Sequence, residues 1–98
     1  KGNNKLEYYN CVNINHNEIG DDGALALANS KNLPKLKILS MFGNVIGDEG
    51  AKHFANSPES KKYIKLDLYK NQFGKDGIRA LNESPNLKNC EELEYYTE

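Results

Sequence analysis

Residues 36–55 read LKILSMFGNVIGDEGAKHFA, and the hydrophobic period changes inside this stretch. Leu39 and Met41 lie two positions apart, which is the period of a strand with one buried face. After Asn44, apolar residues recur at the spacing of an amphipathic helix, namely Ala51, Phe54 and Ala55. The stretch therefore predicts a short strand, a corner and a helix of about ten residues.

The same pattern recurs through the chain at an offset of 27 residues. Identical residues align in four columns: Asn17, Asn44 and Asn71; Gly20, Gly47 and Gly74; Gly23, Gly50 and Gly77; Ser30, Ser57 and Ser84. Such self-similarity at a fixed period is typical of a repeat protein. We therefore expect one domain over residues 1–98, with units near 9–35, 36–62 and 63–89 and a partial unit at 90–98.

Each full unit should contribute one parallel strand and one helix, joined by right-handed crossovers. Strands are expected near Val12–Ile14, Leu39–Met41, Leu66–Leu68 and Leu93–Tyr95, and helices near 21–29, 48–56 and 75–83. The apolar columns predict an inward-facing set: Val12, Ile14, Ile19, Leu27, Leu36, Leu39, Met41, Ile46, Phe54, Leu66, Leu68, Phe73, Leu81 and Leu93.

The residues that recur at the corners have predicted structural roles. An Asn side chain both donates and accepts, so the Asn column can satisfy backbone groups of neighbouring turns. The first Gly column should supply a tight or positive-φ corner, and the second should let each helix pack closely on the sheet. A phosphate-cradling loop is not favoured, because the Gly spacing recurs in every unit. Carboxylates at the helix starts should offset unpaired N–H groups: Asp21, Asp22, Asp48 and Glu49.

The pattern L-x-x-L-x-L-x-x-N-x-I-G-x-x-G-A-x-x-L-A resembles the leucine-rich repeat family, specifically its ribonuclease-inhibitor-like class. The string Gly23-Ala24-Leu25-Ala26-Leu27-Ala28 is also similar to the signature of the GALA subgroup found in some bacterial effectors. The resemblance implies an α/β solenoid with a parallel sheet on its concave face and helices on its convex face. It also implies that the protein binds other proteins, including enzymes that it inhibits or substrates that it presents.

Charge and side-chain chemistry argue against several other functions. The formal net charge is −1, so the sequence gives no electrostatic case for nucleic acid. No apolar run approaches the roughly 18 residues that span a bilayer, so no membrane partner is expected. His16 and His53 lie in different units and cannot form a metal pair, and a Cys11–His16 nucleophile would lack an orienting third group. We therefore expect no catalytic residue, metal or cofactor.

Two cysteines, Cys11 and Cys90, are too few for a disulfide-stabilised miniprotein. Cys90 should point inward on the fourth strand while Cys11 lies on the outer face of the first, three strand spacings away. That separation exceeds the Cα range of a disulfide, so both are expected to be thiols. The cysteine content favours a reducing compartment and a cytoplasmic location, or a host cytosol if the protein is a secreted bacterial effector.

The remaining candidate for function is the concave sheet face. In-register parallel strands stack equivalent residues in columns about 4.8 Å apart. One column is mainly aromatic and contains Asn15, Phe42, Tyr69 and Tyr96. The column beside it is partly acidic and contains Asn13, Ser40, Asp67 and Glu94. The predicted partner-binding residues are Phe42, Tyr69, Tyr96, Ser40, Asp67, Glu94, Lys65 and Ile38. The rings could instead only stiffen the sheet, and Asp67 with Glu94 could share a proton as an acid–base pair.

The leading hypothesis is a non-catalytic module that binds a partner protein, and the carboxylates favour a partner that brings Lys or Arg. The alternative is the recognition segment of a larger regulatory protein, such as a ubiquitin-ligase adaptor, a GTPase regulator or a bacterial effector. Exposed solenoid ends could also self-associate through their strand edges. Glu91, Glu92 and Glu94 charge the last strand and should act against such pairing, and Glu98 replaces the Asn expected in its column.

Overall fold

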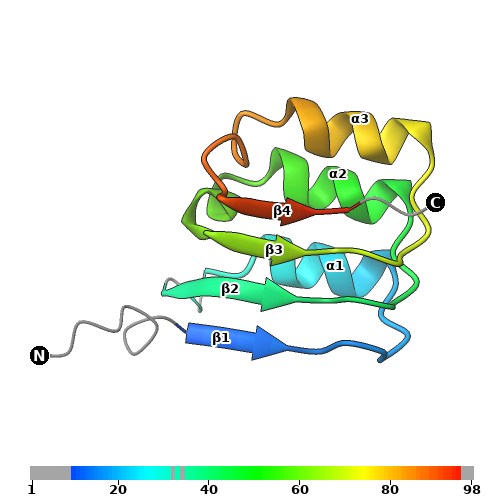
Figure 1. The fold of residues 1–98 in the computed structure, drawn as a ribbon, viewed down its shortest axis with the longest axis horizontal. Coiled ribbons are helices and arrows are strands. Elements are labelled where there is room, and N and C mark those ends of the chain that lie inside the picture. Colours follow the sequence, from blue (N-terminus) through cyan, green and yellow to red (C-terminus); the bar gives the residue numbers. More distant parts are fainter. Residues whose placement is uncertain (1–9, 32, 34, 96–98) are drawn as a thin grey trace, which may run out of the picture.

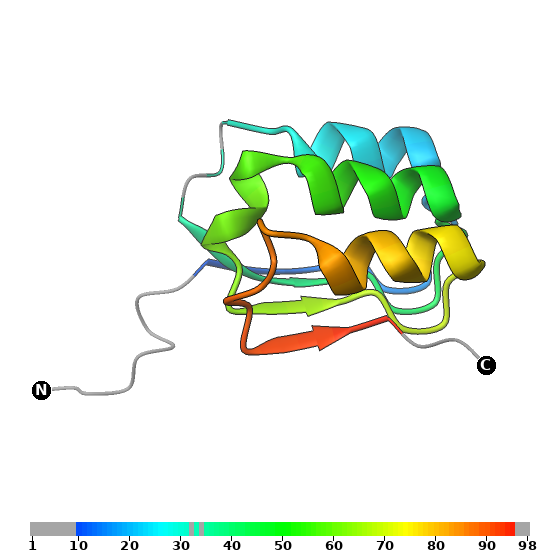
Figure 2. The ribbon, with the colours of Figure 1, turned by 90° about the horizontal axis from the view of Figure 1, so that it is seen from above.

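The computed structural model describes residues 10–31, 33 and 35–95, and these form two layers. Four parallel strands make one sheet in the order β1 (Asn10–Asn13), β2 (Leu36–Ser40), β3 (Lys65–Asp67) and β4 (Glu92–Glu94). The helices α1 (Asp21–Ala28), α2 (Asp48–Asn56) and α3 (Lys75–Glu83) all lie on one side of this sheet (Figures 1 and 2). The predicted strand–helix solenoid is confirmed.

The element boundaries agree closely with the sequence prediction. Helices α2 and α3 cover the expected residues, and α1 ends one residue early. The strands begin earlier than predicted, but their pairing continues past the assigned ends. The N–H groups of Ile14, Met41 and Leu68 still donate to carbonyls of the next strand, those of Ser40, Asp67 and Glu94. The alternating apolar residues therefore mark the end of each ladder, where the chain turns toward the corner.

One element was not predicted, the 3-10 helix η2 (Pro58–Lys62) between α2 and β3. Pro58 occupies its first turn, and the Ser57 side chain accepts a hydrogen bond from the Glu59 N–H. This arrangement is a helix start with a Ser cap and an early proline. Ser57 therefore ends α2 and also begins a second short helix.

The core lies between the sheet and the helices and is centred on the second and third units. Most of the predicted inward set is buried: Leu36, Leu39, Met41, Ile46, Phe54, Leu66, Leu68, Phe73 and Leu81. The other predicted members are half-buried and pack against that core: Val12, Ile14, Ile19, Leu27 and Leu93. These belong to the first and last units, which have a neighbouring unit on only one side within the described residues. Leu87, in the turns after α3, is a core residue that the periodicity missed.

Tyr63 places a hydroxyl in this core. The residue is 3% exposed, its ring lies 6.4 Å from that of Phe54, and burial raises the pKa of its hydroxyl above the ordinary range. Among the described residues, its oxygen is the one buried side-chain polar atom that lacks a hydrogen-bond partner. We predict that Tyr63→Phe raises the free energy of unfolding by about 1 kcal/mol, measured by urea titration, because an unsatisfied buried hydroxyl is costly.

The matched control for this substitution is Tyr69→Phe, which removes a hydroxyl from a half-buried ring on the sheet surface. That change should leave the unfolding free energy nearly unaltered. A less stable Tyr63→Phe protein would mean that the Tyr63 hydroxyl contributes a favourable interaction in the folded state.

Strands β1 and β4 form the two edges of the sheet. Glu92 and Glu94 on β4 are exposed, as is Glu91 just before it, so the acidic edge is present as expected. Glu98 lies outside the described residues. Whether this charge limits self-association stays a prediction.

Candidate protein-binding face

Buried asparagines fix the corners from which the sheet face is built. The Asn44 Oδ1 accepts hydrogen bonds from the N–H groups of Asn17 and Ile19, both at 2.9 Å. Its Nδ2 donates to the carbonyls of Ile14 and Met41, both at 3.0 Å. One amide therefore joins the corners of two successive units, which confirms at Asn44 the role predicted for this column.

Asn71 repeats the arrangement one unit further along. Its Oδ1 accepts from the Ile46 N–H at 3.0 Å, and its Nδ2 donates to the carbonyls of Met41 and Leu68. These asparagines help to hold successive strands in register, so residues that are equivalent in sequence lie side by side on the sheet. The face of the sheet opposite the helices is called the concave face below.

Aspartates at the helix starts tie one unit to the next, which the sequence did not predict. The Asp21 Oδ1 accepts from the N–H groups of Gly47 and Gly50, at 2.7 and 3.0 Å. Asp48 makes the same pair of contacts with Gly74 and Gly77, at 2.6 and 3.0 Å. Each carboxylate therefore caps the helix of the following unit rather than its own, where it also meets the positive end of that helix dipole.

The glycine columns also have roles that differ from those expected. Gly47 precedes α2 with extended backbone, φ −102°, so the first glycine column does not supply a positive-φ corner. Positive φ angles occur instead at His16, Gly43 and Lys70, which form one column three residues after the strands end, and at Glu18. The second glycine column permits close packing, but against the preceding helix. A Cβ on Gly77 would lie 3.2 Å from the Ala51 Cβ.

Strand register brings the predicted face residues together. Ile38 is paired with Lys65 and Lys65 with Glu92, while Ser40 is paired with Asp67 and Asp67 with Glu94. Lys65 and Glu92 form an ion pair at 3.8 Å between partly exposed side chains. The Asp67 Oδ1 accepts from the Tyr69 N–H at 3.1 Å, so this carboxylate also shapes the turn that carries the Tyr69 ring.

The aromatic residues form a continuous row across the concave face. The ring centroids of Phe42 and Tyr69 are 5.8 Å apart, and those of His16 and Phe42 are 5.3 Å apart. We call His16, Phe42 and Tyr69 the aromatic row. Tyr96, the fourth residue predicted for this column, lies outside the described residues.

His16 is the member that sequence reasoning missed. The repeat aligns Asn15 with Phe42, but the Asn15 Oδ1 instead accepts from the Ser40 hydroxyl and from the Phe42 N–H, at 2.8 and 2.7 Å. The His16 ring lies over Gly43, where a Cβ would approach the His16 Nδ1 to 2.5 Å. The sequence does carry a signal for this contact. Gly43 is the equivalent of His16 in the next unit, and its missing side chain leaves room for the ring.

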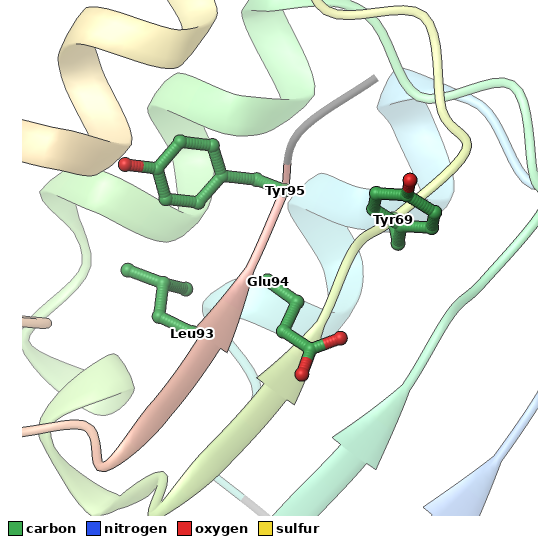
Figure 3. A pocket seen from close by; sticks show the side chains of 4 residues that line it. All are labelled: Tyr69, Leu93, Glu94 and Tyr95. Carbon is green, nitrogen blue, oxygen red and sulfur yellow. The ribbon is translucent and has the colours of Figure 1, made fainter. Parts of the chain in front are cut away.

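An open hollow lies along the edge strand β4. Figure 3 shows Glu94 on one side of β4, toward Tyr69, and Leu93 and Tyr95 on the other side, toward the helices. These four side chains line an open hollow of about 440 Å³. The Tyr95 hydroxyl donates a hydrogen bond to the Asn82 Oδ1 at 3.2 Å, which ties this ring to α3.

Groups that could support other chemistry are dispersed in the described residues. No cluster of three His, Cys, Asp or Glu side chains suited to a metal ion occurs among them. Cys11 and Cys90 are thiols, as predicted, and burial raises the pKa of the Cys90 thiol. No helix in the described ranges combines the length and apolar character needed to cross a membrane.

Comparison with known proteins agrees with this architecture. A family model described as leucine-rich repeat matches residues 10–28 and 32–55, which cover the first two strand–helix units. No curated protein matches the chain significantly. The two matched repeats and the parallel strand–helix solenoid both support a leucine-rich repeat architecture for this chain.

Proposed function

We propose that this protein is a non-catalytic interaction module that binds a partner protein through its concave face. Leucine-rich repeats generally mediate contacts between proteins, which supports the class of function. The observation that carries the choice of face is the aromatic row, whose Phe42 and Tyr69 rings are in contact and partly exposed. Aromatic side chains are frequent anchors at interfaces, because they bury a large area at little cost in rotamer entropy.

The polar surroundings of the row also favour recognition. Asp67 and Glu94 lie beside it, and such charges chiefly set the orientation and association rate of a partner. The proposal places the protein in the cytoplasm, which agrees with two cysteines that form no disulfide.

Tyr69→Ala is expected to weaken partner binding by about 2 kcal/mol, roughly thirtyfold. The partner is first identified by affinity capture on the wild-type protein, and the affinity of each variant for it is then measured by titration calorimetry. Loss of the ring contact with Phe42 should cost only about 0.5–1.5 kcal/mol of stability, so the variant stays folded in a thermal melt.

Leu25→Ala is the matched control, since Leu25 is a 40% exposed apolar residue on α1, away from the sheet face. It should bind as the wild type does. If Leu25→Ala loses the partner while Tyr69→Ala retains it, the binding site belongs to the helix side and the proposal is wrong.

A further inference from the structure

Two carboxylates on the concave face, those of Asp67 and Glu94, form no ion pair with any described residue. Asp67 and Glu94 are directly paired on adjacent strands, an arrangement that places like charges side by side. The nearest face lysine in the register, Lys65, is paired with Glu92. Glu94 is exposed, and its side chain makes no hydrogen bond or ion pair with any other described residue. A cation supplied from outside would therefore relieve this repulsion.

The Tyr69 ring beside these carboxylates already contacts a cation, the Lys70 ammonium group. The Lys70 Nζ lies 5.6 Å from the centroid of that ring, and Lys70 is exposed and makes no ion pair within the described part of the chain. The face of an aromatic ring attracts ammonium and guanidinium groups. Figure 3 shows the Tyr69 ring and the Glu94 carboxylate on the same side of β4, at the hollow described above.

We propose that the partner inserts a basic side chain, Arg or Lys, between the Tyr69 ring and the carboxylates of Asp67 and Glu94. This rests on the proposed function and specifies the partner as a protein segment with a basic residue. A guanidinium fits especially well, because it can stack on the ring and pair with a carboxylate at the same time. Lys70 is then the internal cation with which the partner residue competes.

Replacing Lys70 tests the charge of the partner, because the affinities of a basic and an acidic segment should change in opposite directions. Lys70→Gln removes a positive charge beside the site and keeps a side chain of similar length at the same positive φ. Binding of a basic segment should tighten by about two- to threefold at low salt, since a repulsion is removed. An acidic segment would bind more weakly to this variant.

The probe is a random-peptide phage library selected on the immobilised wild-type protein and depleted on Tyr69→Ala. We expect the recovered peptides to carry Lys or Arg. A synthetic copy should bind Glu94→Gln and Asp67→Asn about tenfold more weakly at low salt, and less so at high salt. Asn is a conservative choice at position 67, because Asn13 already makes the equivalent turn contact, from Asn15 N–H to its Oδ1 at 3.0 Å.

Glu83→Gln is the control for charge, since Glu83 is an exposed carboxylate at the end of α3 on the other side of the sheet. It should leave peptide affinity unchanged. Tyr69-dependent peptides without a basic residue, or weaker binding to Lys70→Gln, would overturn this inference and leave the proposed function in place. If no peptide depends on Tyr69, both fail.

Discussion

Asn44→Ala should lower the free energy of unfolding by about 3 kcal/mol or more, because each buried polar group left unsatisfied costs about 1–3 kcal/mol. Asn44 is 4% exposed, and its amide serves two backbone N–H groups and two carbonyls of two units. The alanine side chain can make none of these hydrogen bonds, so the corners of the first and second units lose their shared hydrogen-bond partner. Urea unfolding followed by circular dichroism measures the effect.

Asn17→Ala is the control within the same column. Asn17 is exposed, and its side chain donates to the neighbouring Asn15 carbonyl at 2.9 Å. This substitution should change stability by about 1 kcal/mol or less, since water can replace an exposed contact. Equal losses at positions 17 and 44 would contradict the view that the bridge between units is what stabilises the corner.

Gly50→Ala should destabilise the protein by about 3 kcal/mol, although alanine is the better helix former by about 1 kcal/mol. A Cβ at this position would overlap the Ile46 Cγ2, and it would lie 2.7 Å from the Asp21 Oδ1 and 3.1 Å from the Ala24 Cβ. The first helix would have to move away, and the hydrogen bond from the Gly50 N–H to Asp21 would be strained with it.

Gly47→Ala distinguishes this steric argument from a general need for glycine at the corner. Its Cβ would meet only the Asp21 carboxylate, at 3.5 Å or more, and its φ of −102° suits any residue. The thermal stability of this variant should stay close to that of the wild type. A large loss here, or a stable Gly50→Ala protein, would refute the assignment of close packing to the second glycine column.

Most residues that the repeat marks as equivalent were placed correctly from the sequence, with Asn15 as the exception in the aromatic column. The period identified the strands, the helices and the register that pairs Ser40, Asp67 and Glu94. The role of the Asn column followed from chemistry, because an amide that donates and accepts suits a corner with unpaired groups of both kinds. Phe42 and Tyr69 were expected as neighbours on one face, and their rings are in contact.

The sequence by itself therefore determined which residues stack, because in-register parallel repeats convert a 27-residue period directly into neighbours in space. Only the tertiary structure decided which atoms meet between units. Asp21 caps the helix that follows in the next unit, and the His16 ring enters the aromatic row by way of a positive φ angle and the space above Gly43. These contacts depend on the offset between adjacent helices and on the corner conformation. A sequence period contains neither the helix offset nor the corner conformation. It shows which residues are equivalent, but it does not show how far a side chain reaches toward the next unit.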